Sequence, residues 1–234
     1  MSFKKEYLDL VLVPSGLLIM FAYHLFLLHR YLNRPHKTAM GFENFYREIW
    51  VEKIMQTNKR EEVNTALTVI SSNTTAATTL ASVVLTLSSL IGAWLGGNVN
   101  TVFTSDLIFG DTRPATISLK YICLLICFLL AFSCFVQSAR HFVHANYLIS
   151  TPDIDIAVEE VRRAVIRGGD FWSLGLRALY FALNLLLWFF GPIPMFVYSA
   201  VMVFLFHFLD SNTKPVPHHH KIQKNSHLRT SLIV

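Results

Sequence analysis

The chain has 234 residues, of which 53% are hydrophobic and only 15% are charged. Soluble domains carry about 25% charged residues, so this composition excludes an ordinary soluble domain and favours an integral membrane protein. The formal net charge is +5, and the basic residues flank apolar runs. Membrane lipids with anionic headgroups are therefore the expected partner, and nucleic acid is not.

Four apolar stretches are long enough to cross a bilayer, which takes about 20 helical residues. They cover residues 7–28, 64–95, 117–139 and 176–209. We therefore predict an all-α fold: one polytopic membrane helix bundle over residues 1–210 with four transmembrane helices, followed by a disordered tail at 211–234. Cys123, Cys127 and Cys134 lie in the third stretch and are expected to be structural thiols, with no metal site and no cofactor.

Two polar segments between these stretches are expected to form amphipathic helices at the cytosolic surface. In the first segment, apolar residues recur at helical spacing and predict an aromatic face against lipid or against the bundle: Phe42, Phe45, Tyr46, Ile49, Trp50 and Ile54. In the second, Thr151-Pro152-Asp153 has the residue types of a helix start, and Gly168-Gly169 is typical of a helix end.

The second apolar stretch has hydroxyl groups along one side. Six residues fall within an arc of about 80° on a helix: Ser71, Thr75, Thr78, Ser82, Thr86 and Ser89. The stripe indicates either close helix packing or the lining of a pore in a homo-oligomer, with basic residues at its cytosolic mouth that favour an inorganic anion. The opposite side, which includes Val84 and Ile91, is expected to face lipid. Asn73 begins a glycosylation motif, but its place near the cytosolic end of a span favours a hydrogen bond to another helix.

A polar face is expected where the third helix leaves the membrane, because Gln137, Arg140, His141 and His144 follow i, i+3, i+4, i+7 spacing. It is either a solvated helix extension or an anion or phosphate-headgroup site, completed by Arg177 and Arg30, since arginine binds phosphate with paired hydrogen bonds. Three isolated polar residues within or near spans are weaker candidates for function: His24, Asn184 and His207.

The fourth stretch is too long for one crossing. Its residues would make a helix of about 51 Å, whereas the hydrocarbon core is about 30 Å thick. Gly191, Pro192 and Pro194 lie in its middle and must kink or break it. We expect one kinked span. Two half-helices that form a re-entrant hairpin are the alternative, and they would bring the C-terminus to the other side of the membrane.

The distribution of basic residues predicts the topology. Segments 30–62 and 140–177 hold seven and five Lys or Arg residues, whereas segment 97–117 holds only Arg113. The two basic segments should therefore face the cytosol. The tail after residue 210 carries four more basic residues, and these fit the hairpin better than the kinked span.

Three parts of the sequence resemble a plant membrane protein family known as domain of unknown function 599. They are an opening group, Tyr23-His24, Arg30, Pro35, Gly41 and Trp50-Val51; the stretch 136–141; and the block 171–195, which contains LLLWFFGPIPM. The resemblance implies a four-helix integral membrane protein and supplies no activity. Val63-Asn64 departs from the family pattern, which has an Arg-Asn pair at the start of the second span.

No catalytic motif of recognisable spacing occurs, so we do not expect an enzyme. The leading hypothesis is an oligomeric anion-conducting channel lined by the Ser/Thr-rich second span. The alternative is a non-conducting membrane scaffold or regulator that binds a protein or anionic lipid through its basic cytosolic segments. A membrane enzyme or transporter that uses the polar face around Arg140 ranks lowest.

Overall fold

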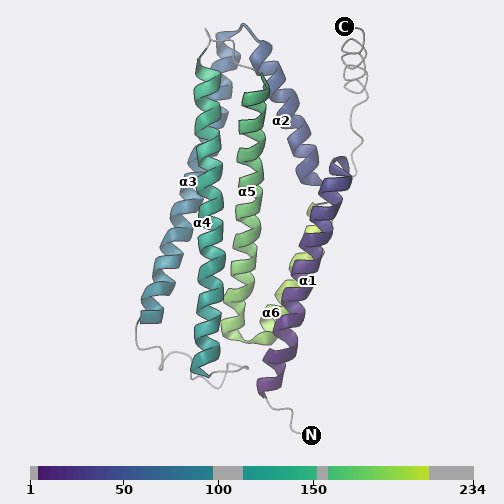
Figure 1. Cartoon of the computed structure of the whole chain (residues 1–234), viewed down its shortest axis with the longest axis vertical. Coiled ribbons are helices and arrows are strands. Elements are labelled where there is room, and N and C mark those ends of the chain that lie inside the picture. Colours follow the sequence, from purple (N-terminus) through teal and green to yellow (C-terminus); the bar gives the residue numbers. More distant parts are fainter. Residues whose placement is uncertain (1–4, 97–112, 152–157, 211–234) are drawn as a thin grey trace.

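The structure, a computed structural model, describes residues 5–96, 113–151 and 158–210 (Figure 1). The fold is all-α. Its helices are α1 (Lys5–Asn33), α2 (Ala39–Gln56), α3 (Arg60–Gly96), α4 (Pro114–Ser150), α5 (Val158–Leu187) and α6 (Pro192–Leu209), with 3₁₀ turns η1 (Pro35–Lys37) and η3 (Trp188–Phe190). Five of these helices, all except α2, are long and apolar enough to cross a membrane. The chain is a multi-pass integral membrane protein.

Five candidate spans replace the four that the sequence predicted, and the difference arises in residues 158–209. Helix α5 has 30 residues and a length of about 45 Å, so it can cross the bilayer by itself. The chain then breaks, and α6 returns with 18 residues, or about 27 Å. The single kinked span is therefore not confirmed. The hairpin alternative agrees with the reversal of the chain at Gly191, but it expected two half-helices where the structure has two helices of spanning length.

The break between α5 and α6 is fixed by one glycine and by polar contacts. Gly191 has φ 131° and ψ 168°, a backbone conformation that only glycine adopts readily. The buried Lys120 ammonium donates to the carbonyl oxygen of Trp188 at 3.1 Å, and the Trp188 indole donates to the buried Asp9 carboxylate at 2.7 Å. Helix ends leave carbonyls without intrahelical partners, so a cation at this position stabilises the end of α5.

Helices α4 and α5 pack closely along their length at the centre of the fold (Figure 1). A side chain at Gly168 would collide with the ring of Phe142, and one at Gly175 with the ring of Phe135. The Ser138 hydroxyl donates to the Gly168 carbonyl across the contact at 2.8 Å. The predicted helix end at Gly168-Gly169 is therefore wrong: α5 continues through both glycines because they allow close packing. The predicted helix start at Thr151-Pro152-Asp153 extends beyond the described residues.

The remaining helices attach to the two sides of this pair. Helix α3 packs mainly on α4, and α1 packs along α6. The first helix and the last therefore lie side by side, with a hydrogen bond of 3.2 Å from Tyr23 to Asp210. The backbone N–H of Ala39 also donates to the Asp210 carbonyl at 3.0 Å, so the end of α6 lies beside the start of α2. The predicted tail at 211–234 lies outside the described residues.

Helix α2 crosses the outside of α5 and contacts it through polar groups as well as apolar ones. Arg162 on α5 binds Glu52 at 2.6 Å and Glu48 at 3.4 Å, and the Asn44 amide donates to Asp170 at 2.8 Å. The buried residues of α2 are Gly41, Asn44, Val51 and Ile54. Of the predicted aromatic face, Ile54 is therefore buried, Phe42, Phe45, Ile49 and Trp50 are half-buried, and Tyr46 is exposed.

This arrangement predicts the sidedness of the chain. A tag after residue 210 should be labelled from the same side as a tag in the 57–59 loop, and a tag in segment 97–112 from the opposite side, because five spans place α2 and the end of α6 together. The positive-inside rule assigns the shared side to the cytosol. Membrane-impermeant labelling of intact vesicles measures this. A C-terminal tag that is labelled together with segment 97–112 would restore the four-span topology.

Candidate functional site

A basic cavity of about 840 Å³ opens between α4, α5 and the end of α1. The polar face predicted on α4 forms one wall, and α5 forms the other with Arg167 and Asp170. The ring of His141 stacks on Phe171 at a centroid distance of 5.6 Å. The lining residues are Tyr31, Met40, Gln137, Arg140, His141, His144, Arg167, Asp170, Phe171 and Leu174.

The charges in this cavity are unbalanced. Arg140 and Arg167 are exposed, and neither forms an ion pair with another residue in the described parts of the chain. The one carboxylate in the wall, Asp170, accepts a hydrogen bond from Asn44. By contrast, Arg47, Arg162 and Arg177 each have an acidic partner. An anion in the cavity would therefore meet two arginines that have no competing carboxylate partner.

A second cavity of about 280 Å³ adjoins the basic one. Tyr31, Met40, Asp170 and Leu174 line both. The second cavity lies further along α5, towards the membrane-spanning part. Leu25, Leu27 and Leu28 form an apolar wall on α1, and the Arg177–Asp210 ion pair lies in another wall. The two cavities together have one end whose arginines are unpaired within the described residues and one end with an apolar wall, where the arginine is paired.

Two arginines expected in the anion site lie elsewhere. Arg177 pairs with Asp210 at 3.0 Å, with both side chains less than one-fifth exposed, and it lines the apolar cavity rather than the basic one. The carboxylate of Asp210 also accepts from Tyr23. Arg30 is half-buried near the end of α1 and lines neither of the two cavities. The structure therefore brings together Arg140, His141 and His144 in one cavity. It adds Arg167, which the sequence did not predict there, because α5 continues unbroken through Gly168-Gly169 to Asp170 and beyond.

The hydroxyl stripe of α3 lies on the outer surface. All six of its residues are exposed, so the stripe does not hold the single chain together. The side expected to face lipid is the buried one: Val84 and Ile91 belong to the core against α4. The reason is that α4 presents bulky apolar residues, and Ala77, Ala81 and Val84 fit against them.

Most of the stripe hydroxyls bond to their own helix. Thr75, Thr78, Ser82, Thr86 and Ser89 donate to carbonyls one turn earlier, at 2.9–3.0 Å. This satisfies the hydroxyl hydrogen without a second helix, which lowers the cost of exposing it to lipid. The outward face then presents mainly oxygen lone pairs.

The isolated polar residues have structural surroundings. Asn184 and Ser199 are fully buried, and the Ser199 hydroxyl donates to the Asn184 oxygen at 3.1 Å. Gly16 of α1 lies against this hydroxyl, so the pair marks the contact of α1, α5 and α6. His24 bonds to the carbonyl of Met20 at 2.8 Å, and His207 is exposed at the end of α6.

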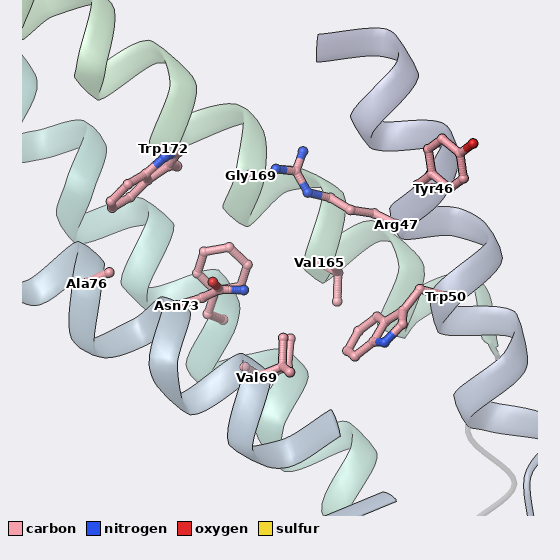
Figure 2. A pocket seen from close by; sticks show the side chains of 11 residues that line it. Tyr46, Arg47, Trp50, Val69, Asn73, Ala76, Val165, Gly169 and Trp172 are labelled. Atoms are coloured by element: carbon pink, nitrogen blue, oxygen red, sulfur yellow. The ribbon is translucent and has the colours of Figure 1, made fainter. Parts of the chain in front are cut away.

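A third cavity, which we call the aromatic groove, lies between α2, α3 and α5 on the other side of the α4–α5 pair (Figure 2). Its volume is about 470 Å³. Trp50 and Trp172 line it, together with Arg47 and Asn73. The sequence does not predict this groove, because its residues come from helices whose relative positions only the structure shows. The expected hydrogen bond from Asn73 to another helix is not formed within the described residues.

Within the described ranges, no group of three or more His, Cys, Asp or Glu side chains is placed to hold a metal ion. Cys134 is buried, and Cys123 and Cys127 are half-buried, all as free thiols.

Comparison with known proteins finds one family. The model of the family described as "Protein of unknown function, DUF599" matches residues 11–215, in agreement with the resemblance read from the sequence. No curated protein matches the chain, and no solved structure does.

The pairing of Arg177 with Asp210 predicts a loss of stability in the Asp210→Asn variant. The substitution leaves a mostly buried guanidinium without its counter-charge and should lower the free energy of unfolding by about 1–3 kcal/mol. This is less than the loss expected for a fully buried ion pair, because both side chains are partly exposed. Thermal unfolding of the detergent-purified protein measures it. The matched control is Glu43→Gln, which removes the more exposed partner of Arg47 and should cost less than about 1 kcal/mol. Equal losses in both variants would contradict the structural role of Asp210.

Proposed function

The chain belongs to the family of proteins of unknown function DUF599, and because that description names no activity, we propose from the geometry that it binds an anionic phospholipid at its cytosolic end. In this proposal the protein is a membrane scaffold or regulator, and its function is binding rather than catalysis. The observation that carries the proposal is the basic cavity, whose two unpaired arginines continue into an apolar cavity.

The basic cavity fits a phosphate group. Arg140 and Arg167 approach from two different helices and line the same cavity, so one phosphate can accept hydrogen bonds from both. The side-chain amide of Gln137 and the rings of His141 and His144 add further polar groups. Arginine suits phosphate because its planar guanidinium presents paired N–H donors. A carboxylate headgroup would meet the same donors.

The adjoining apolar cavity fits an acyl chain. It shares four lining residues with the basic cavity and is bounded by leucines of α1 that lie within a candidate span. A phospholipid whose phosphate lies near Arg140 could therefore extend its acyl chain through this cavity towards the hydrocarbon core of the membrane. Free phosphate would use only the charged end, and this difference separates the two ligands experimentally.

A second candidate function is an anion-conducting pore, which the outward position of the α3 hydroxyl stripe favours. Because the stripe is exposed in the single chain, it is available to line a central pathway if several copies associate through α3. The hydroxyl hydrogens turn back to the helix carbonyls, so an anion would have to attract them outward. This requirement makes the pore the weaker of the two proposals.

The lipid proposal predicts the effect of the double variant Arg140→Gln/Arg167→Gln. Its affinity for dioctanoyl phosphatidic acid should fall at least about tenfold, the equivalent of one charge-assisted hydrogen bond. Retention of dioctanoyl phosphatidylcholine, whose net charge is zero, should change little. Native mass spectrometry of the purified protein counts the bound lipid, with inorganic phosphate as a competitor.

Arg163→Gln is the matched control for that experiment, because Arg163 is exposed on α5 but does not line the basic cavity. An equal loss in this control would mean that the lipid responds to total charge alone and would contradict a specific site. Displacement by millimolar phosphate as efficiently as by phosphatidic acid would point to a free anion instead of a lipid.

The pore proposal predicts that Thr78→Phe abolishes chloride or nitrate flux in proteoliposomes, with potassium flux as the comparison. The ring would fill a pathway lined by the stripe. Val83→Phe is the control, since Val83 is exposed on a different side of α3 and should leave flux unchanged. Absence of flux from correctly assembled wild-type protein, or unchanged flux in Thr78→Phe, would rule the pore out.

A further inference from the structure

The aromatic groove is a distinct cavity, separated from the basic one by the α4–α5 pair. Positions 165, 169 and 172 of α5 face the groove, whereas positions 167, 171 and 174 line the basic cavity. On a helix these two sets lie on opposite sides, because successive residues are rotated by about 100°. A ligand in the groove therefore does not occupy the lipid site proposed above, and the two can be tested separately.

The walls of the groove are mainly aromatic and apolar. Figure 2 shows Trp50 reaching from α2 and Trp172 from α5, with Val165 between them. The ring of Phe142 completes the wall from α4. The volume of about 470 Å³ falls in the range of pockets that bind small molecules, about 300–1,000 Å³. These surfaces favour a ligand with a substantial apolar part.

One cation lies at the edge of the groove. The guanidinium of Arg47 lies over the backbone of Gly169, where an added methyl group would come within 2.6 Å of its central carbon (Figure 2). Arg47 donates to the Asn44 oxygen at 2.6 Å and to the Glu43 carboxylate at 3.1 Å. A guanidinium has five N–H donors, so these two bonds leave several for a ligand. Glu43 is 59% exposed and therefore holds the arginine weakly.

One amide lies in the groove wall on α3. Asn73 is within a candidate span, and its neighbours in the groove include Val69, Ile70 and Ala76, which offer no side-chain hydrogen-bonding group. The Asn73 side chain is exposed and forms no hydrogen bond within the described residues, and a polar group within a span is a candidate for function. A ligand oxygen in the groove would provide the missing partner.

We propose that the aromatic groove binds a long-chain carboxylate, with its carboxylate held by Arg47 and Asn73 and its hydrocarbon chain between Trp172, Phe142 and Ala76. A carboxylate supplies the negative charge that Arg47 attracts and the acceptor oxygens that both side chains require. The chain then leaves the groove along α3 towards the hydrocarbon. This assignment rests on residues of α2, α3, α4 and α5 and does not depend on the lipid site or on the pore.

The test is native mass spectrometry of the purified full-length protein with palmitate and with methyl palmitate. Palmitate should bind wild type at least about tenfold more tightly than the ester, because only the acid carries a negative charge that pairs with the guanidinium of Arg47. Arg47→Gln should therefore weaken palmitate more than the ester, whereas Asn73→Leu should weaken both, since the ester carbonyl also accepts from the amide. Ala76→Phe, which fills the groove from an exposed position, should reduce binding of both.

Ala93→Phe is the matched control, since it adds the same ring at an exposed position of α3 outside the groove. Its palmitate affinity should equal that of the wild type. Equal affinity for acid and ester would overturn the assignment of a carboxylate. Unchanged palmitate binding in Ala76→Phe would overturn the assignment of the groove. Neither result bears on phosphatidic acid binding at Arg140 and Arg167, so this proposal and the lipid proposal fail independently.

Discussion

The close approach of α4 and α5 is the contact on which the rest of the structure depends. Two glycines of α5 allow it, because Phe142 and Phe135 occupy the space that side chains at 168 and 175 would fill. The hydroxyl of Ser138 then reaches the Gly168 carbonyl across the contact. In a bilayer the hydrophobic effect does not drive helices together, so van der Waals packing and hydrogen bonds of this kind must do so. Helix α3 packs on one side of the α4–α5 pair. The basic cavity and the aromatic groove open on the two opposite faces of this pair.

Helix α2 connects these two faces. It holds α5 through Asn44 and Asp170, beside the basic cavity, and it supplies Arg47 and Trp50 to the aromatic groove. Each cavity combines a cation near the membrane surface with an apolar interior. That combination follows from the depth of the site, because charged groups remain at the interface while the hydrocarbon accepts only apolar parts of a ligand. A ligand in either cavity would contact residues on both α2 and α5.

Composition and hydropathy were enough to predict a helical membrane protein, and the spacing of Arg140, His141 and His144 located one wall of the basic cavity. The count of spans failed because residues 176–209 form one unbroken apolar stretch in the sequence, whereas the structure divides them between two helices at Gly191. The extent of α5 was a separate error, because Gly168-Gly169 is typical of a helix end. A glycine that ends a helix and a glycine that admits a neighbouring ring have the same local signature, and only the position of Phe142 distinguishes them. Arg167 was missed for the same reason, since its place opposite Arg140 depends on α5 continuing unbroken. The aromatic groove is lined by residues from four helices, so no single segment of the sequence predicts it.

The pairing of α1 with α6 has a consequence for biosynthesis. Tyr23 and Asp210 are separated by 187 positions in the sequence, so α1 enters the membrane long before its partner has been synthesised. Until then, Gly16 has no Ser199 to pack against, and Asp9 lacks the Trp188 indole that it binds in the finished fold. Such long-range contacts form late, since the intervening chain must first be ordered. The nascent protein therefore passes through a stage in which its first helix lacks the contacts that α6 supplies, and a chain terminated before α6 would leave that side of α1 without its partner helix.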